Sequence, residues 1–100
     1  IDNYLSSTER YSIDTNIWEY LPDKPGRPRN GRCAVSTTGS EIYIVGGDCT
    51  RSVDVYGTAT LTWKNRNYAL HMPEERIYPA AVVLEKRYLV VIGGYNCFDE

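Results

Sequence analysis

The sequence predicts an all-β fold built from a repeated unit, and three features carry this prediction. Nine tyrosines and two tryptophans stand beside a single phenylalanine in the 100-residue chain, and aromatic side chains of this kind favour strands. Short blocks rich in β-branched and aromatic residues alternate with turn sequences, and no window shows an apolar period of 3.6 residues. The same landmarks also occur twice along the chain, in the same order.

The first landmark is a pair of glycines at the end of an apolar run. Gly46-Gly47 ends the segment IYIVGG and Gly93-Gly94 ends LVVIGG, which gives a spacing of 93 − 46 = 47 residues. Glycine permits a positive φ angle and a close backbone approach where a strand leaves a sheet. We therefore expect these four glycines to have a structural role.

The second landmark is a tyrosine followed seven residues later by a tryptophan. Tyr11 precedes Trp18 and Tyr56 precedes Trp63, with a spacing of 63 − 18 = 45 residues between the tryptophans. Large aromatic side chains bury much area between packed sheets. These four residues are expected to pack between neighbouring repeat units.

The strands within one period can be placed from composition. The blocks CAVST, EIYIVGG, SVDVYG and LTWKNRNY are separated by turn sequences, which predicts four strands per unit. The runs IYIV and LVVI are continuously apolar, so both faces of these two strands are expected to be covered. SVDVYG alternates, with Val53 and Val55 on one side and Asp54 and Tyr56 on the other.

Four strands per period of about fifty residues are typical of a propeller blade, and the residues resemble the kelch repeat. That repeat has a glycine pair after its second strand, a tyrosine in its third and a tryptophan about seven residues later. The chain supplies IYIVGG and then VDVYGTATLTW, and ERYSIDTNIW is close to the pattern Glu-Arg-Tyr-Asp-x-x-x-Asn-x-Trp. Ser12 and Gly57 depart from the pattern, because the family often has Asp at these positions.

The resemblance implies an all-β, kelch-type β-propeller segment with one complete four-stranded blade flanked by two half blades. The complete blade is expected at residues 26–73. Residues 1–25 are expected to form the third and fourth strands of a first blade, and residues 74–100 the first two strands of a following blade. Propellers need about four to eight blades to close, so the remaining blades come either from a longer chain or from other copies. Three copies would give six blades.

Few features of the sequence indicate chemistry. The formal net charge of −2 gives no indication of a nucleic acid or membrane partner, and Cys33, Cys49 and Cys97 are too widely spaced for a metal knuckle. His71 is the single histidine, and no nucleophile motif accompanies it. We expect no catalytic residues, no metal and no cofactor. The absence of a signal peptide pattern and of glycosylation acceptors favours a reduced, cytoplasmic location, and Cys49 and Cys97 could then be accessible loop thiols.

The expected partner is a protein or peptide. The segments 48–52 and 95–100 follow the second strands and should emerge on one face of the propeller, where Arg51, Tyr95 and Phe98 are candidate contacts. In kelch modules of cullin-ligase adaptors, arginines near the first strand often line a central pocket. This resemblance makes Arg29, Arg32 and Arg76 candidates for binding an acidic peptide. Alternatively, each guanidinium group pairs with a carbonyl or an acid of a neighbouring blade.

The resemblance therefore implies a non-catalytic protein–protein interaction module. Substrate recognition in a ubiquitin-ligase adaptor is one use of such modules. Cytoskeletal, actin-type binding and a role as scaffold subunit of a larger assembly are alternatives. A fragment of a propeller enzyme is a further alternative, because propeller blades also occur in enzymes.

Overall fold

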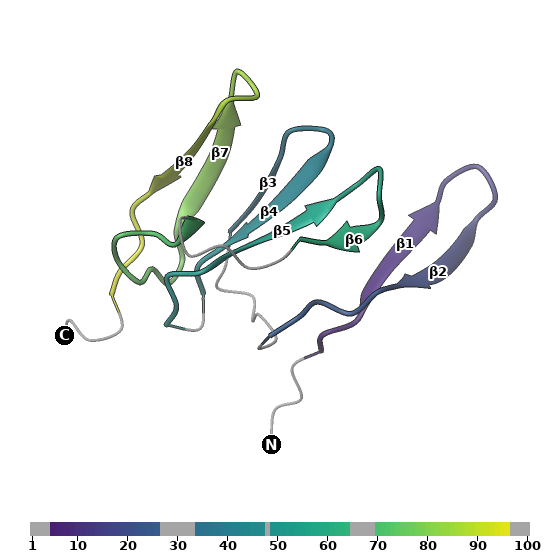
Figure 1. Ribbon diagram of the computed structural model, residues 1–100, viewed down its shortest axis with the longest axis horizontal. Coiled ribbons are helices and arrows are strands. Elements are labelled where there is room, and N and C mark those ends of the chain that lie inside the picture. The colour runs from purple at the N-terminus through teal and green to yellow at the C-terminus, as the bar shows by residue number, and fades with distance from the viewer. Residues whose placement is uncertain (1–4, 27–33, 48, 65–69, 97–100) are drawn as a thin grey trace.

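The computed structural model describes residues 5–26, 34–47, 49–64 and 70–96, which form three antiparallel sheets (Figure 1). A two-stranded sheet comes first, a four-stranded sheet follows, and a second two-stranded sheet comes last. Each strand pairs with its neighbour in sequence within its sheet. The strands are β1 (Thr8–Ser12), β2 (Ile17–Leu21), β3 (Ala34–Thr37), β4 (Glu41–Val45), β5 (Val53–Gly57), β6 (Thr62–Trp63), β7 (Ala80–Leu84) and β8 (Tyr88–Ile92).

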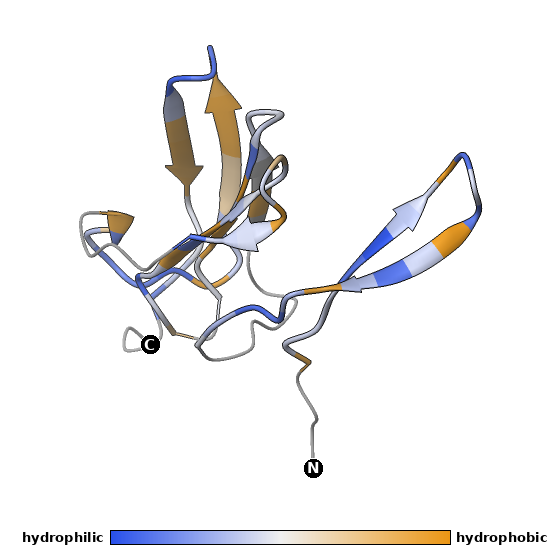
Figure 2. Ribbon diagram, turned by 45° about the vertical axis from the view of Figure 1, so that its right-hand side comes forward, coloured by the Kyte–Doolittle hydropathy of each residue, from blue (hydrophilic) through white to orange (hydrophobic). Residues whose placement is uncertain are grey.

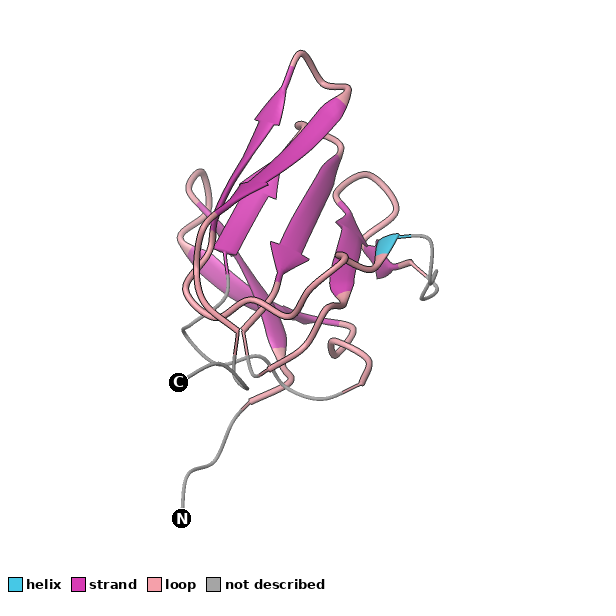
Figure 3. Ribbon diagram, turned by 90° about the vertical axis from the view of Figure 1, so that its left-hand side faces the viewer, coloured by secondary structure: helices cyan, strands magenta, loops and turns pink. Residues whose placement is uncertain are grey.

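The three sheets stand side by side, with the four-stranded sheet in the middle (Figure 1). The β1–β2 hairpin lies on one side of it and the β7–β8 hairpin on the other, where β7 contacts β3. Strands and loops make up the described parts of the chain, apart from a helical turn at Leu70 (Figure 3). Among these residues, no helix is long and apolar enough to span a bilayer. The prediction of an all-β protein is confirmed for the described residues.

The apolar core lies between the central sheet and the β7–β8 hairpin. Val45, Val53, Val55 and Met72 are buried there. Because successive side chains of a strand point to opposite faces, one face of β4 and β5 supplies these valines. The hairpin covers this face with partly buried side chains, and Tyr43 of β4 packs at the same place; the covering residues are Ala81, Leu89 and Val91.

The β1–β2 and β5–β6 hairpins have the same local structure. Each has a four-residue loop, 13–16 or 58–61, between the last paired residues of its strands. Each loop ends on a residue with a positive φ, 60° at Asn16 and 57° at Leu61. The amide of this residue donates to the carbonyl of the last paired residue of the first strand, at 2.8 Å for Asn16 and 2.9 Å for Leu61. The sequence spacing of 45 residues therefore corresponds to a repeated hairpin.

The β3–β4 and β7–β8 hairpins differ by one residue in register. The repeat spacing of 47 would place Ala81 opposite Ile92, but Ala80 is the residue that pairs with Ile92. The reason is the turn. Thr38 N donates to Glu41 O at 3.0 Å, which leaves a two-residue turn at 39–40. The three residues 85–87 connect β7 and β8, with a φ of 54° at both residue 85 and residue 86.

The two continuous apolar strands are covered to different extents. The prediction that both faces are covered agrees with β4, where Ile42 and Ile44 are half-buried and Val45 is buried. It is wrong for β8, because Ile92 is 58% exposed. Figure 2 shows that β7 and β8 carry much of the apolar colour, and their exposed side chains are Val82, Leu84, Tyr88 and Ile92.

Candidate functional site

The repeated tyrosine and tryptophan residues are directly opposite each other in their hairpins. Tyr11 pairs with Trp18 and Tyr56 pairs with Trp63, and the ring centroids are 5.0 Å apart in both pairs. The indole Nε1 of Trp63 donates to Pro22 O at 3.0 Å, which connects the central sheet to the segment after β2. The second pair therefore contacts the segment that follows the first hairpin. The expected packing between repeat units is wrong for the first pair among the described residues, because Tyr11 is 41% and Trp18 66% exposed.

The two glycine pairs all have positive φ angles, 70° and 75° at Gly46 and Gly47, and 69° and 83° at Gly93 and Gly94. Two of these glycines are also in close backbone contact. A Cβ atom on Gly46 would lie 2.7 Å from Arg76 O, and a Cβ atom on Gly94 would lie 2.6 Å from the carbonyl oxygen of residue 77. A Cβ atom on Gly93 would meet no atom within 4 Å.

Arg76 connects the glycine pairs through both its backbone and its side chain. Its carbonyl oxygen accepts a hydrogen bond from Gly47 N at 2.8 Å. Its Nη1 atom donates to Gly93 O at 2.7 Å. The half-buried guanidinium group therefore bonds a carbonyl of its own hairpin, whereas the alternative from the sequence placed that carbonyl in a neighbouring blade.

Tyr95 lies beside Arg76. Its backbone pairs with Ile77 through two hydrogen bonds of 2.9 and 3.0 Å. The residue is 55% exposed, and its ring centroid is 6.1 Å from that of Tyr78. Arg76 and Tyr95 line a polar hollow of about 290 Å³, together with Glu74, Glu75, Gly93, Gly94 and Asn96.

The charges around this hollow do not favour an acidic ligand. Two carboxylates, Glu74 and Glu75, line it beside the single guanidinium group of Arg76. A bidentate pairing with a ligand carboxylate would compete with like-charge repulsion from these two residues. The expected preference for an acidic peptide therefore has no support from this part of the surface.

The other candidate contacts do not line this hollow or lie outside the described residues. Arg51 is exposed in the loop between β4 and β5, and its carbonyl oxygen accepts from Met72 N at 2.8 Å. Arg29, Arg32 and Phe98 lie outside the described residues. The structure thus brings together two of the six predicted contact residues.

Cys49 differs from the expectation of a free loop thiol. It is disulfide-bonded, so an accessible thiolate is not present at this position. Cys33 and Cys97 lie outside the described residues. His71 is half-buried in the segment before β7. Within the ranges that the structure describes, no group of three or more His, Cys, Asp or Glu side chains could hold a metal ion.

The sequence analysis missed a buried ion pair. Lys24 Nζ lies 2.9 Å from Asp54 Oδ2, and the two side chains are 7% and 3% exposed. The same ammonium group donates to Pro25 O at 2.8 Å. The sequence contains a partial signal, since an acidic residue inside a strand with valines on both sides needs a partner when buried. It contains no signal for the choice of Lys24, which is 30 residues away.

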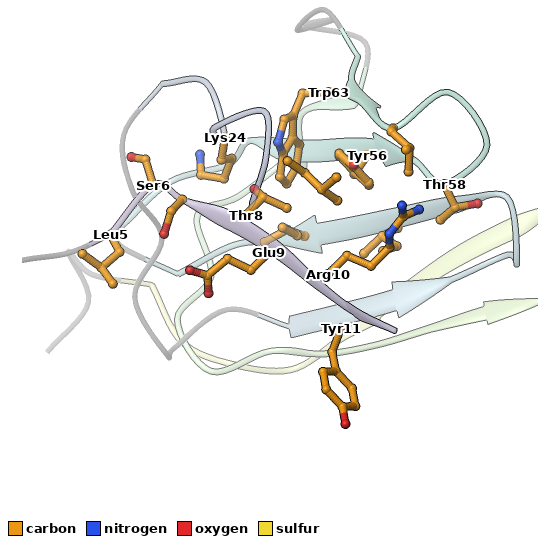
Figure 4. Close-up of a pocket in the computed structure, with 15 residues that line it drawn as sticks. Leu5, Ser6, Thr8, Glu9, Arg10, Tyr11, Lys24, Tyr56, Thr58 and Trp63 are labelled. Carbon is orange, nitrogen blue, oxygen red and sulfur yellow. The ribbon is translucent and has the colours of Figure 1, made fainter. Parts of the chain in front are cut away.

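A groove of about 600 Å³ lies between β1 and the central sheet. Figure 4 shows β1 crossing in front of the sheet, with Tyr56 and Trp63 on one side of the strand and Tyr11 pointing away from them on the other. Apolar side chains of the central sheet, Ile42 and Ile44, also line it. The hydroxyl of Tyr56 is buried there and has no hydrogen-bond partner among the described residues.

A second polar cluster lies across the central sheet. Lys64 contacts the carboxylate of Glu41, and Tyr43 Oη donates to Glu41 Oε1 at 2.7 Å. These two hydrogen bonds, of which that from Lys64 is the larger influence, lower the pKa of Glu41. The hydrogen bond to Glu41 raises the pKa of Tyr43 because it stabilises the protonated phenol. The cluster connects Lys64, which follows β6, to β4, and we interpret it as a structural contact.

Comparison with known proteins shows a distant similarity to a kelch-like protein. The chain is 29% identical over 97 residues to "Kelch-like protein 38" of Rattus norvegicus. The match covers 92% of the chain but 16% of that protein, so the chain spans about a sixth of its length. No protein-family model matches the chain. The similarity agrees with the resemblance found in the sequence, and it indicates a kelch-type relationship at a distance.

Proposed function

We propose that the chain is a non-catalytic protein–protein interaction module, built as a segment of a kelch-type β-propeller. The four-stranded sheet would be the complete blade of residues 26–73. The β1–β2 hairpin would be the outer half of the blade before it, and the β7–β8 hairpin would be the inner half of the blade after it. The similarity to a kelch-like protein supports this proposal.

The observation that carries the proposal is that one sequence repeat corresponds to one repeated structure. The two Tyr–Trp hairpins agree in register, loop length and loop hydrogen bond. Repeat units of this kind form a rigid scaffold that presents variable loops, and loops on such scaffolds are common sites of recognition. The loops at one end of the molecule, with Arg51, Arg76 and Tyr95, are the proposed contact surface.

Several uses are compatible with such a module. Substrate recognition in a ubiquitin-ligase adaptor is the first, and cytoskeletal binding or a scaffold role in a larger assembly is the second. A BTB or F-box region in a longer chain would favour the adaptor. Additional histidine and tyrosine ligands in other blades would favour an enzyme instead. The acidic nature of the ligand is a prediction that the peptide selection below also tests.

The proposal can be tested by selecting a displayed peptide library against the purified chain. Four single variants distinguish the two ends of the β7–β8 hairpin. Tyr95→Ala and Arg76→Glu change the hollow, whereas Tyr88→Ala and Arg87→Glu change the turn end. Tyr95 and Tyr88 are a matched pair, since they are 55% and 54% exposed.

We expect selected peptides to share a sequence pattern and to bind the hollow variants at least about tenfold more weakly, because interface tyrosines and arginines are frequent hot spots. Binding to the turn-end variants should be unchanged. Circular dichroism of each variant checks that the fold is kept. Peptides that share no pattern, or that bind all four variants equally well, would contradict the proposed contact surface.

A further inference from the structure

The connection between β4 and β5, at the lower end of the central sheet in Figure 1, carries a disulfide bond at an exposed position. Cys49 lies in this connection, is exposed and is disulfide-bonded. The chain has three cysteines, so the second sulfur atom belongs to Cys33 or Cys97. Exposed disulfides are within reach of an attacking thiolate and are reduced more easily than buried ones. This bond therefore has the accessibility that reversible reduction requires.

The backbone at this cysteine has a conformation that few side chains adopt. Cys49 has a φ of 54°, in the left-handed region that is sparsely populated for a residue of this kind. Such a conformation persists only where the surrounding structure enforces it. At Asn16 and Leu61, which also have a positive φ, the loop has four residues and strand pairs close it. Cys49 is instead four residues from the end of β4 and four from the start of β5.

One hydrogen bond depends directly on the conformation of this cysteine. Thr50 N donates to Gly47 O at 3.1 Å, which closes a turn with Cys49 at its third position. A positive φ at the third position is typical of turns of types II and I′. The next residue is anchored to the core, because Arg51 O accepts from Met72 N at 2.8 Å and Met72 is a core residue. The turn therefore lies between the disulfide and the point where the loop is anchored.

We propose that Cys49 is a site of reversible thiol–disulfide exchange, and that the state of its disulfide sets the conformation of the turn before Arg51. The reductant is a dithiol. One of its thiolates attacks Sγ of Cys49, the S–S bond breaks, and the other cysteine leaves as a thiolate that takes up a proton. The second thiolate of the reductant attacks the mixed disulfide and releases Cys49. Two electrons and two protons thus pass to the chain, and the dithiol is oxidised to a disulfide.

Reduction of the bond releases the turn. Without the cross-link, Cys49 returns to the well-populated region of negative φ, and the hydrogen bond from Thr50 N to Gly47 O is lost. The exposed side chain of Arg51 follows directly, so its direction changes with the turn. The sequence predicts a reduced location, where disulfides are usually transient and redox-sensing. The consequence for binding rests on the proposed contact surface, whereas the exchange reaction and the change in the turn do not.

The first test measures the exchange reaction and the turn without any ligand. The purified chain is treated with dithiothreitol, its thiols are counted by alkylation and mass spectrometry, and amide hydrogen exchange is followed by NMR. After reduction the amide of Thr50 should exchange at least about tenfold faster, because its hydrogen bond is lost. The amide of Leu61 is the internal control with unchanged exchange expected, since it closes a turn with a φ of 57° and a bond of 2.9 Å.

Three outcomes of this test would overturn the proposal. The first is a disulfide that resists the dithiol while the chain is folded. The second is an unchanged exchange rate at Thr50 after reduction. The third is an equal acceleration at Thr50 and Leu61, because the bond would then stabilise the whole fold and not the turn.

Matched substitutions separate the cross-link from the backbone conformation. Cys49→Ser should reproduce the fast exchange of the reduced chain. Cys49→Gly also removes the bond, but glycine adopts a positive φ readily, so the amide of Thr50 should exchange at least about threefold more slowly than in Cys49→Ser. Of Cys33→Ser and Cys97→Ser, the variant that removes the partner should behave as the reduced chain and the other as wild type. Equal exchange in the two Cys49 variants would contradict the role of the turn, and an effect of both or neither of the other two would contradict the exchange site.

A binding measurement distinguishes this inference from the proposed function. Peptides that are selected against the oxidised chain and weakened by Arg51→Ala should bind the reduced chain at least about threefold more weakly, because the arginine has moved. Peptides that tolerate Arg51→Ala should bind both states equally. Equal binding of all peptides to both states would overturn the control of binding. If no peptide is selected at all, the proposed function fails, and the exchange rates at Thr50 still decide whether the turn responds.

Discussion

The β1–β2 and β5–β6 hairpins are nearly identical in backbone structure but differ in their surroundings. Both place a tyrosine opposite a tryptophan with a centroid distance of 5.0 Å. Tyr11 is nevertheless 41% exposed, whereas Tyr56 is 4% exposed. The difference arises because β5 is flanked by β4, whereas no described strand pairs with the other edge of β1. Local sequence therefore determines the hairpin, and neighbouring strands determine how much of it is buried.

The largest difference between the two hairpins should come from the buried ion pair. Asp54 of β5 corresponds to Glu9 of β1, since 54 − 45 = 9. Asp54→Ala leaves the buried ammonium group of Lys24 without its partner and should lower the free energy of unfolding by about 3–5 kcal/mol. Glu9→Ala, at an exposed position, should change it by less than about 0.5 kcal/mol. Chemical denaturation of both variants measures this; equal effects would show that the pair makes no special contribution.

The second comparison concerns the two glycine pairs. Gly46→Ala and Gly93→Ala both place a side chain at a φ near 70°, which costs about 1–2 kcal/mol for a non-glycine residue. At Gly46 the new Cβ atom also meets Arg76 O at 2.7 Å, whereas at Gly93 it meets no atom. The loss of stability should therefore be larger for Gly46→Ala by about 1 kcal/mol or more. Thermal unfolding of the two variants measures both losses. A larger loss for Gly93→Ala would contradict the close contact between Gly46 and Arg76 O.

The third comparison concerns the hydroxyl groups of Tyr56 and Tyr11, whose removal should change stability in opposite directions. The hydroxyl of Tyr56 is buried without a partner among the described residues, whereas the hydroxyl of Tyr11 donates to the side chain of Asn16. Tyr56→Phe should therefore leave stability unchanged or raise it by about 1 kcal/mol. Tyr11→Phe should lower it by about 0.5 kcal/mol, because the bond is exposed. Urea denaturation with both variants in parallel measures the difference, and a loss of stability in Tyr56→Phe would contradict the assignment.

The smallest effect is expected at two surface ion pairs, and it depends on pH. The folded chain lowers the pKa of Glu41, so its contribution is present above the unfolded pKa and is lost as the pH falls through the folded value. Lys64 is 54% exposed, so solvent limits the contribution to less than about 1 kcal/mol. Glu41→Gln should remove it at pH 7, and the difference from wild type should shrink as the pH falls below the ordinary pKa of a glutamate.

The control for this effect lies in the first hairpin. Glu19 is the counterpart of Lys64, since 64 − 45 = 19, and it pairs with Arg10 at 2.8 Å where both side chains are nearly half exposed. Glu19→Gln should cost about 0.3 kcal/mol or less at pH 7. Denaturation over a pH series distinguishes the two, and a larger effect for Glu19→Gln would contradict the order.

The sequence predicted those parts of the fold that depend on local residues. The blocks EIYIVGG and SVDVYG predicted the positions of β4 and β5, and the apolar run LVVI predicted that of β8. The four-residue loops between tyrosine and tryptophan were not predicted. The one-residue shift in register between β7 and β8 was not predicted. It arises because the turn has three residues, and a turn of this length needs the positive φ angles of Glu85 and Lys86. Composition gives no signal for a positive φ at these two residues.

The candidate contact residues were predicted only in part. The sequence named Arg76 and Tyr95 separately as candidate contacts and did not predict that Arg76 donates to the carbonyl of Gly93. It could not show that Glu74 and Glu75 line the same hollow. The buried pair of Lys24 and Asp54 was missed for a related reason: contacts between sheets depend on the relative placement of segments, which a repeat in one chain does not fix.

The contact between Lys24 and Asp54 also has a mechanical consequence. The β1–β2 hairpin is joined to the central sheet by this ion pair and by the hydrogen bond from Trp63 to Pro22. The β7–β8 hairpin is joined mainly through the shared apolar core, and the segment before it also accepts a backbone hydrogen bond from Gly47 N at Arg76 O. Polar contacts of this kind are short in range, so they resist pulling up to a small extension and then break together. When the two ends of the chain are drawn apart, we therefore expect the N-terminal hairpin to detach first.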